Sequence, residues 1–241
     1  LLAPFLAATA TLAAEPACGL WDDEQAPMQR RLSLETLQLL ATESAGLALQ
    51  VHQQALAAVL NRCVGAAPDE DEVSLPLLGG AQGMGREAVV RAVTGHPLSG
   101  EHTACLADNW CWPSEASPRL IHALPDWRQL WLPVWRPDQG WQWHRLSREQ
   151  VCEKLLPHSH GLDELSTCAL WVEPAVSGAA VPLISGAEAA ARWLGLQAMH
   201  TVGLQAISQG AVARAWKLAR EQALLRRQGG VHIMEHAAVR L

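Results

Sequence analysis

The longest regular pattern of hydrophobic and polar positions lies near the end of the chain, between Ser185 and Gln228. Ser185 and Glu188 have the S-x-x-E spacing of a capping box, so a helix is predicted to begin there. No proline follows before Gln228, which predicts a helix of about 40 residues that is ~60 Å long. Its apolar positions recur at roughly helical spacing: Trp193, Leu196, Met199, Leu204, Ile207, Val212, Trp216 and Ala219.

The end of this predicted helix carries turn and charge signals. Gly229-Gly230 is expected to stop the helix, and Arg226-Arg227 supplies positive charge at its C-terminal end. A second helix is predicted to begin near Ile233. Because so long a helix is stabilised mainly by packing of its apolar face, the pattern is typical of half of an antiparallel bundle. We expect the other half to come from a partner chain, a second copy, or a C-terminal part beyond Leu241.

The first part of the chain, residues 1–97, also shows helical patterns and is predicted to form an N-terminal α-helical domain. Its strongest element runs from Leu34 to Asn61, with Ser33 as N-cap and Gly65 just beyond its end. The apolar, alanine-rich start, Leu1–Ala14, lacks a basic leader, so a buried first helix is favoured over a secretory signal.

Strand-like patterns replace the helical ones between residues 98 and 183. Alternating or continuous apolar runs predict strands at Thr103–Trp112, Leu130–Trp135, Trp141–Leu146 and Cys168–Val172. Pro133 favours an edge position for the second strand, and the segment Arg136–Gly140 is a hairpin signal. The predicted class is α+β, with a middle β domain (98–183), a small barrel or sandwich, between the helical domain and the start of a C-terminal helical bundle (184–241).

Composition narrows the classes of partner. The net charge of −6 argues against a nucleic-acid-binding surface, and no apolar run is long enough to span a membrane. With 49% hydrophobic and only 17% charged residues, the chain is expected to bury extra surface in a homo- or hetero-oligomer through its C-terminal helices. Six cysteines without a C-x-x-C pair are typical of a reduced, cytoplasmic protein.

Other candidate sites have better structural explanations. The acidic run Asp69–Glu72 is interpreted as a solvated turn. The glycine-rich run Gly79–Gly85 has neither the G-x-G-x-x-G spacing nor the P-loop spacing of phosphate-binding loops. His158 and His160 lack supporting ligand spacing from Cys152 or Asp163, so no metal site is predicted. Neighbouring acid and imidazole groups at positions 235 and 236 would point apart on a helix, which favours a packing role.

Three segments resemble the acyl-CoA dehydrogenase family in the expected order. The first is the C-terminal segment, which is similar to the family's pattern of a helix, R-x-Q-F/G-G and P-I-x-E-x-Q-x-V. Its three parts here are the run Ala215–Arg220, R-R-Q-G-G at Arg226–Gly230, and I-M-E-H-A-A-V at Ile233–Val239. His160–Val172 resembles the G-x-R-x-S-x-T strand of the middle domain, and Leu34–Gly65 resembles a long helix of the N-terminal domain. The resemblance covers most of the chain and implies the same three-part architecture.

This resemblance implies an FAD site. In the family, the Arg and Gln of the R-x-Q motif reach the FAD of the neighbouring subunit, so Arg226 and Gln228 would contact FAD across a dimer interface, with Gly229 and Gly230 allowing close approach of the backbone. The alternative is simple capping of the helix end by arginine followed by a glycine stop.

Other parts of the family's site are missing from this sequence. The T-E-P-x-A-G-S-D loop has no counterpart in Ala104–Ser114, and the W-I-T strand corresponds to Leu120–His122, where His122 replaces the hydroxyl. Proton removal in α,β-dehydrogenation needs a carboxylate base. At the first family position the chain has Ala191, Glu188 lies one turn earlier, and the second position lies beyond the end, so the catalytic residues stay unknown.

The leading hypothesis is therefore an FAD-dependent, acyl-CoA dehydrogenase-like oxidoreductase that acts on an acyl-CoA-type thioester. The resemblance implies that its electrons pass to an electron-transfer flavoprotein or to oxygen. A catalytically inactive, diverged subunit that supports an active partner chain is the second hypothesis, and an unrelated α+β binding protein is the third.

Overall fold

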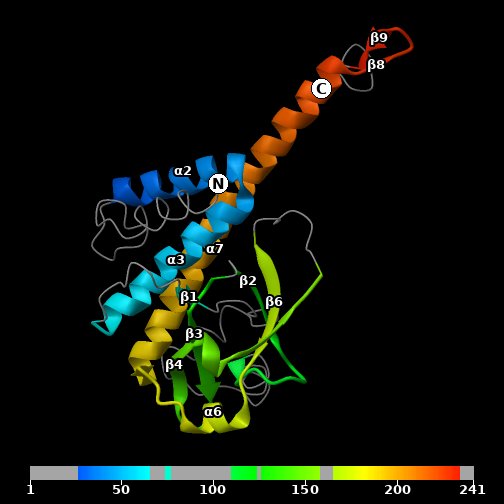
Figure 1. Ribbon diagram of the computed structural model, residues 1–241. Coiled ribbons are helices and arrows are strands. Elements are labelled where there is room, and N and C mark those ends of the chain that lie inside the picture. The colour runs from blue at the N-terminus through cyan, green and yellow to red at the C-terminus, as the bar shows by residue number, and fades with distance from the viewer. Residues whose placement is uncertain (1–26, 66–73, 77–109, 124–125, 158–164, 234–241) are drawn as a thin grey trace.

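The computed structural model describes residues 27–65, 74–76, 110–123, 126–157 and 165–233. Two N-terminal helices lie against the first half of a long C-terminal helix, α7, and two small sheets lie on the other side of them (Figure 1). This arrangement is α+β, as the sequence predicts. Among the described residues, no helix has both the length and the apolar character needed to cross a membrane.

The N-terminal helical region forms two helices, α2 (Pro27–Glu43) and α3 (Ala45–Cys63), where the sequence predicts one. The break lies at Ser44, which has an extended backbone and accepts a hydrogen bond from the Leu47 N–H at 3.1 Å. Ser33 lies inside α2, so its assignment as an N-cap is wrong. The capping ability of Ser44 at the start of a new helix outweighs the continuous apolar periodicity across it.

The described strands form two sheets. One has the order β1 (Ser74–Pro76), β3 (Gln129–Arg136), β4 (Gly140–Ser147), β7 (Ile184–Ser185). The other has the order β2 (Arg119–Ala123), β6 (Ser166–Trp171), β5 (Cys152–Leu155). Three predicted strands correspond to β3, β4 and β6. Residues 110–112 of the first predicted strand are not in a strand, and the rest of that prediction lies outside the described residues.

The hairpin predicted at Arg136–Gly140 is confirmed, because β3 and β4 pair antiparallel with Arg136 opposite Gly140. The edge position predicted from Pro133 is wrong, because β3 lies between β1 and β4. β1 pairs only with residues 129–131, so Pro133 lies beyond that ladder and its missing N–H breaks no bond of it. The two sheets share an apolar cluster that includes Ile121, Leu132, Val134 and Leu170. Whether they close as a barrel or a sandwich stays a prediction.

Tryptophan side chains link the sheets to the helices. The indole of Trp131 on β3 donates to Asn61 Oδ1 of α3 at 3.0 Å, and the indole of Trp143 on β4 donates to the Ala189 carbonyl of α7 at 3.1 Å. A large apolar surface with one hydrogen-bond donor suits such contacts between layers. Among the described residues, six tryptophans are almost completely buried: Trp110, Trp127, Trp131, Trp141, Trp143 and Trp193.

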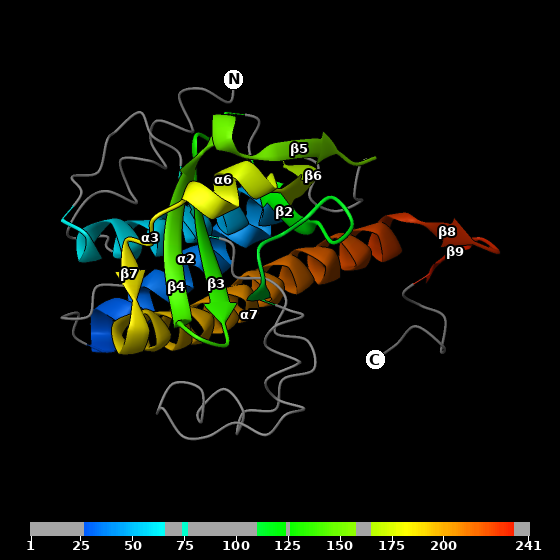
Figure 2. The same cartoon turned by 90° about the horizontal axis from the view of Figure 1, so that it is seen from below.

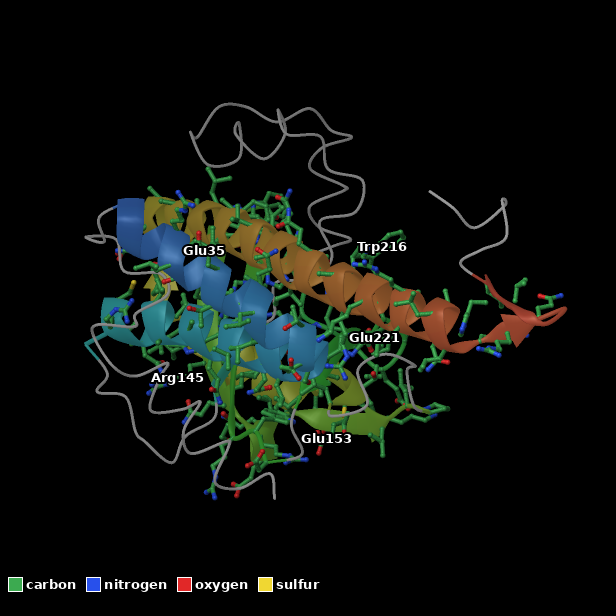
Figure 3. The ribbon with its side chains drawn as sticks, turned by 90° about the horizontal axis from the view of Figure 1, so that it is seen from above. Glu35, Arg145, Glu153, Trp216 and Glu221 are labelled. Carbon is green, nitrogen blue, oxygen red and sulfur yellow. The ribbon has the colours of Figure 1, made fainter. Side chains whose placement is uncertain are left out.

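The predicted C-terminal helix is α7, Gly186–Leu225, with 40 residues. Ser185 is its N-cap, but the Ser185 side chain makes no capping hydrogen bond, so the predicted capping box does not form. The first half of α7 packs on α2 and α3, whereas nearly every residue after Ala211 is exposed. Trp216 and Glu221 project from this outer half, beyond the helix α2 that carries Glu35 (Figure 3).

Two glycines allow the close approach of α7 to the N-terminal helices. A Cβ at Gly203 would lie 2.2 Å from Cε1 of His52 on α3. A Cβ at Gly210 would lie 2.1 Å from the Gln38 carbonyl oxygen of α2. Both distances are far shorter than van der Waals contact, so only glycine fits at these two crossings.

Three short elements complete the described fold: η2 (Arg148–Gln150), α6 (Pro174–Ala179) and the hairpin of β8 (Arg227–Gln228) and β9 (Val231–His232). α6 lies at the end of the sheets away from α2 and α3 (Figure 1). The β8–β9 hairpin lies at the far end of α7, as Figure 2 shows from below. The helix predicted from Ile233 lies almost entirely outside the described residues.

Candidate functional site

The R-R-Q-G-G motif forms the hairpin at the tip of α7. Arg226 is the C-cap of the helix, and β8 and β9 pair through Gln228 and Val231. Gly229 and Gly230 form the turn with φ values of 61° and 85°, as in type I′ hairpins, which require two positive φ values. The glycines therefore turn a hairpin, and the prediction that they end the helix is wrong, because α7 already ends at Leu225.

Backbone and side-chain bonds fix the base of this hairpin. The Ile233 N–H donates to the Arg226 carbonyl at 2.9 Å. The Arg227 guanidinium donates to Nε2 of His232 at 3.3 Å, across the two strands. Nδ1 of His232 is buried and has no partner in the described chain. The first arginine of the motif is thus a cap and the second is held by the imidazole.

The surface around the hairpin is positively charged. Lys217, Arg220, Arg226 and Arg227 are exposed along the last turns of α7 and the hairpin, with Glu221 as the acidic residue among them. The chain as a whole has a net charge of −6, so the sign of the charge at this tip is opposite to that of the whole chain. Cations with fixed donors at such a density favour an anionic ligand.

The residues of the hairpin could contact one side of a diphosphate-bearing cofactor, but the sheets of this chain do not supply the other side. The Arg226 side chain makes no ion pair within the described residues, and a Cβ at Gly229 or Gly230 would meet nothing within 4 Å. The backbone of the turn is therefore open to a ligand. The hairpin also lies at the opposite end of α7 from the sheets (Figure 1), so the sheets of this chain do not cover it.

The middle-domain candidate, His122, is held within the second sheet. His122 on β2 lies opposite Thr167 on β6, and its Nδ1 is 3.0 Å from the Thr167 Oγ1. This hydrogen bond gives His122 a structural role in the sheet. The structure does not bring His122 together with the hairpin, because β2 and the tip of α7 are widely separated in both views (Figures 1 and 2).

The first turns of α7 contain no carboxylate turned into the protein. Glu188 and Ala191 are exposed, whereas Ala189, Ala190 and Trp193 are buried against the sheet and its neighbours. Trp193 stacks on Trp141 with a ring-centroid distance of 4.3 Å. A packed indole therefore occupies the inward face of α7 near the family's first position for the base.

Several sequence candidates lie outside the described residues. These are the start Leu1–Ala14, the acidic and glycine-rich runs, most of the segment compared with the T-E-P loop, the pair His158 and His160, and Glu235 with its neighbour. Within the described ranges, no group of three or more His, Cys, Asp or Glu residues is placed to hold a metal ion.

An imidazole pair between α3 and α7, with His52 buried and His200 half-buried, was not predicted. Nε2 of His52 lies 3.4 Å from Nδ1 of His200, and the rings are stacked with an interplanar angle of 3°. Burial, and then the charge of His200, lowers the pKa of His52 to about 3. Burial also lowers the pKa of His200, so both rings are neutral at pH 7. Because the two residues are 148 positions apart, no local pattern could connect them.

Comparison with known proteins gives matches in structure but not in sequence. No family model matches the chain, and no curated protein matches it in sequence. Butyryl-CoA dehydrogenase from Megasphaera elsdenii has a TM-score of 0.63 and 13% identity, over 98% of this chain and 63% of that chain. Glutaryl-CoA dehydrogenase from Mycobacterium smegmatis, in complex with FADH2, has a TM-score of 0.58 and 10% identity, over 99% and 64%.

The ChsE4–ChsE5 complex from Mycobacterium tuberculosis is similar at a TM-score of 0.58 and 16% identity, over 98% of this chain and 60% of that chain. The chain therefore has the fold of the acyl-CoA dehydrogenases, which confirms the resemblance at the level of the fold. It spans about 63% of the length of the butyryl-CoA dehydrogenase that it matches.

Proposed function

We propose that this chain is an FAD-dependent oxidoreductase subunit of the acyl-CoA dehydrogenase type, which acts in α,β-dehydrogenation of an acyl-CoA-type thioester. The observation that carries the proposal is the open, cationic R-R-Q-G-G hairpin at the tip of α7, in a chain with this fold. We also propose the division into an N-terminal helical domain (1–97), a middle β domain (98–183) and a partial C-terminal bundle (184–241).

In this proposal, the hairpin holds the cofactor of a neighbouring subunit. The Arg226 guanidinium neutralises the diphosphate of FAD, the Gln228 amide adds a directional hydrogen bond, and Gly229 lets the backbone approach. Because the hairpin stands away from the sheets of its own chain, a second copy or a partner chain supplies the other side of the site. Bound FAD would supply hydride acceptance, with an electron-transfer flavoprotein or oxygen as the final acceptor.

The alternative, a catalytically inactive subunit, is favoured by one observation. The inward face of α7 near Ala191 carries alanines and the stacked Trp193 instead of a carboxylate base. Such a chain would still contribute its hairpin to the FAD site of an active partner, while the partner chain removes the α-proton.

Flavin retention tests the proposal. The purified chain is mixed with FAD, desalted and examined by visible absorption, and its mass in solution is measured by light scattering. We expect retained flavin bands and an oligomer. Arg226→Ala should weaken FAD binding by about tenfold or more, since an ionic hydrogen bond to phosphate contributes roughly 1.5–3 kcal/mol.

Arg62→Ala is the matched control, because Arg62 is an exposed arginine in the last turn of α3, outside the positively charged tip of α7. No flavin bands in any oligomeric state, or equal retention by the two variants, would contradict the proposal. Flavin that is retained only after co-expression with an active dehydrogenase chain would select the inactive-subunit alternative.

A further inference from the structure

An open pocket of about 770 Å³ lies at the end of the sheets near α6, far from the hairpin. Residues 112–116 form one wall, and residues 171–174 with Ser177 form the other. The Val172 N–H donates to the Pro113 carbonyl at 3.0 Å, so a backbone hydrogen bond joins the two walls. The volume falls within the range of small-molecule sites in proteins.

The side chains of the pocket combine aromatic rings with negative charge. Trp112 and Trp171 contribute indole rings, one from each wall, and Glu115 and Glu173 contribute carboxylates in the same way. Within the described residues, neither carboxylate has a cationic partner, and no Lys or Arg lines the pocket. Trp112 packs against His144, whose ring centroid is 4.6 Å away.

The thiol of Cys152 lies next to these carboxylates and is affected by their negative charge. Cys152 Sγ is 3.9 Å from Glu173 Oε1 and donates to it. Burial raises the pKa of the Cys152 thiol, and the charges of Glu173 and then of Glu115 raise it further. The two carboxylates from opposite walls therefore act on one region, where no cation of the described residues forms an ion pair with either of them.

From this combination we propose that the pocket binds a small organic ammonium ion. The face of an indole attracts a cation through its quadrupole, and the attraction is strongest for a weakly hydrated, alkylated ammonium group. The carboxylates of Glu115 and Glu173, which have no cationic partner within the described residues, add a Coulomb attraction that a neutral ligand of the same shape would not gain.

The first test uses choline as the probe and 3,3-dimethylbutan-1-ol as its neutral isostere. The full chain is labelled with 15N in its tryptophans, and the indole N–H signals are followed by NMR during titration. Trp112→Phe and Trp171→Phe assign the two pocket signals. We expect choline to shift both signals saturably, to leave Trp216 on the outer half of α7 unchanged, and to bind about tenfold more tightly than the alcohol.

The second test changes charge without changing shape. Glu115→Gln and Glu173→Gln should each weaken choline binding by several-fold, whereas Glu149→Gln, an exposed glutamate on η2 outside the pocket, should have no effect. Absence of a saturable shift, equal binding of choline and the alcohol, or unchanged binding in both pocket variants would overturn the proposal. If one tryptophan variant does not fold, the other tryptophan variant and the two glutamine variants still test choline binding. None of these outcomes depends on FAD retention.

Discussion

The close crossing of α7 and α2 at Gly210 makes a sharp prediction about stability. In Gly210→Ala, the new methyl group would lie 2.1 Å from the Gln38 carbonyl oxygen and 2.7 Å from Cβ of Ala41. The nearest atom belongs to a helix backbone, so relief requires one helix to move. Such overpacking costs about 1–3 kcal/mol, and alanine returns about 1 kcal/mol of helix propensity relative to glycine. We expect the free energy of unfolding to fall by up to roughly 2 kcal/mol.

Gly195→Ala is the matched control on the same helix. A Cβ at Gly195 would meet nothing within 4 Å, so only the propensity term applies and the free energy of unfolding should rise by up to about 1 kcal/mol. Urea unfolding followed by circular dichroism measures both changes. If Gly210→Ala is as stable as Gly195→Ala, the two helices do not approach each other as closely as the structure shows, and the reasoning is refuted.

Three further predictions concern titration, reactivity and capping. Because burial lowers the pKa of His52 to about 3 from its ordinary value of 6.5, the unfolded chain binds a proton below pH 6.5 that the folded chain does not. Stability should therefore fall with pH from about 6.5 toward 3, and His52→Gln should reduce this slope by up to ~1.4 kcal/mol per pH unit in urea unfolding; an unchanged slope would contradict the buried neutral imidazole. Glu173→Gln should lower the raised pKa of Cys152 and accelerate its alkylation by iodoacetamide, measured by mass spectrometry with the exposed Cys111 as reference; an unchanged rate would show that the carboxylate does not act on the thiol. Ser44→Ala should lower the free energy of unfolding by about 0.5–2 kcal/mol, because the capping bond of α3 is lost, and a neutral effect would assign the break to chain geometry alone.

The elements that the sequence predicted well are those set by local patterns. Helical spacing without proline predicted α7 at nearly its observed length, and alternation around Arg136–Gly140 predicted the β3–β4 hairpin. The errors arose where two local signals compete. Ser44 splits the N-terminal helix although the apolar pattern continues, and Gly229-Gly230 turns a hairpin after the helix has already ended.

The sequence by itself determined the main helices and strands, the α+β class, and the position of the R-x-Q-G-G motif just after a long helix. These follow from periodicity, capping and glycine, which act over a few residues. Only the tertiary structure decided that Pro133 lies in an inner strand, that His52 stacks on His200, and that two tryptophans and two glutamates face one pocket. Those contacts join residues far apart in the chain, and burial and charge act through space, so no local pattern records them.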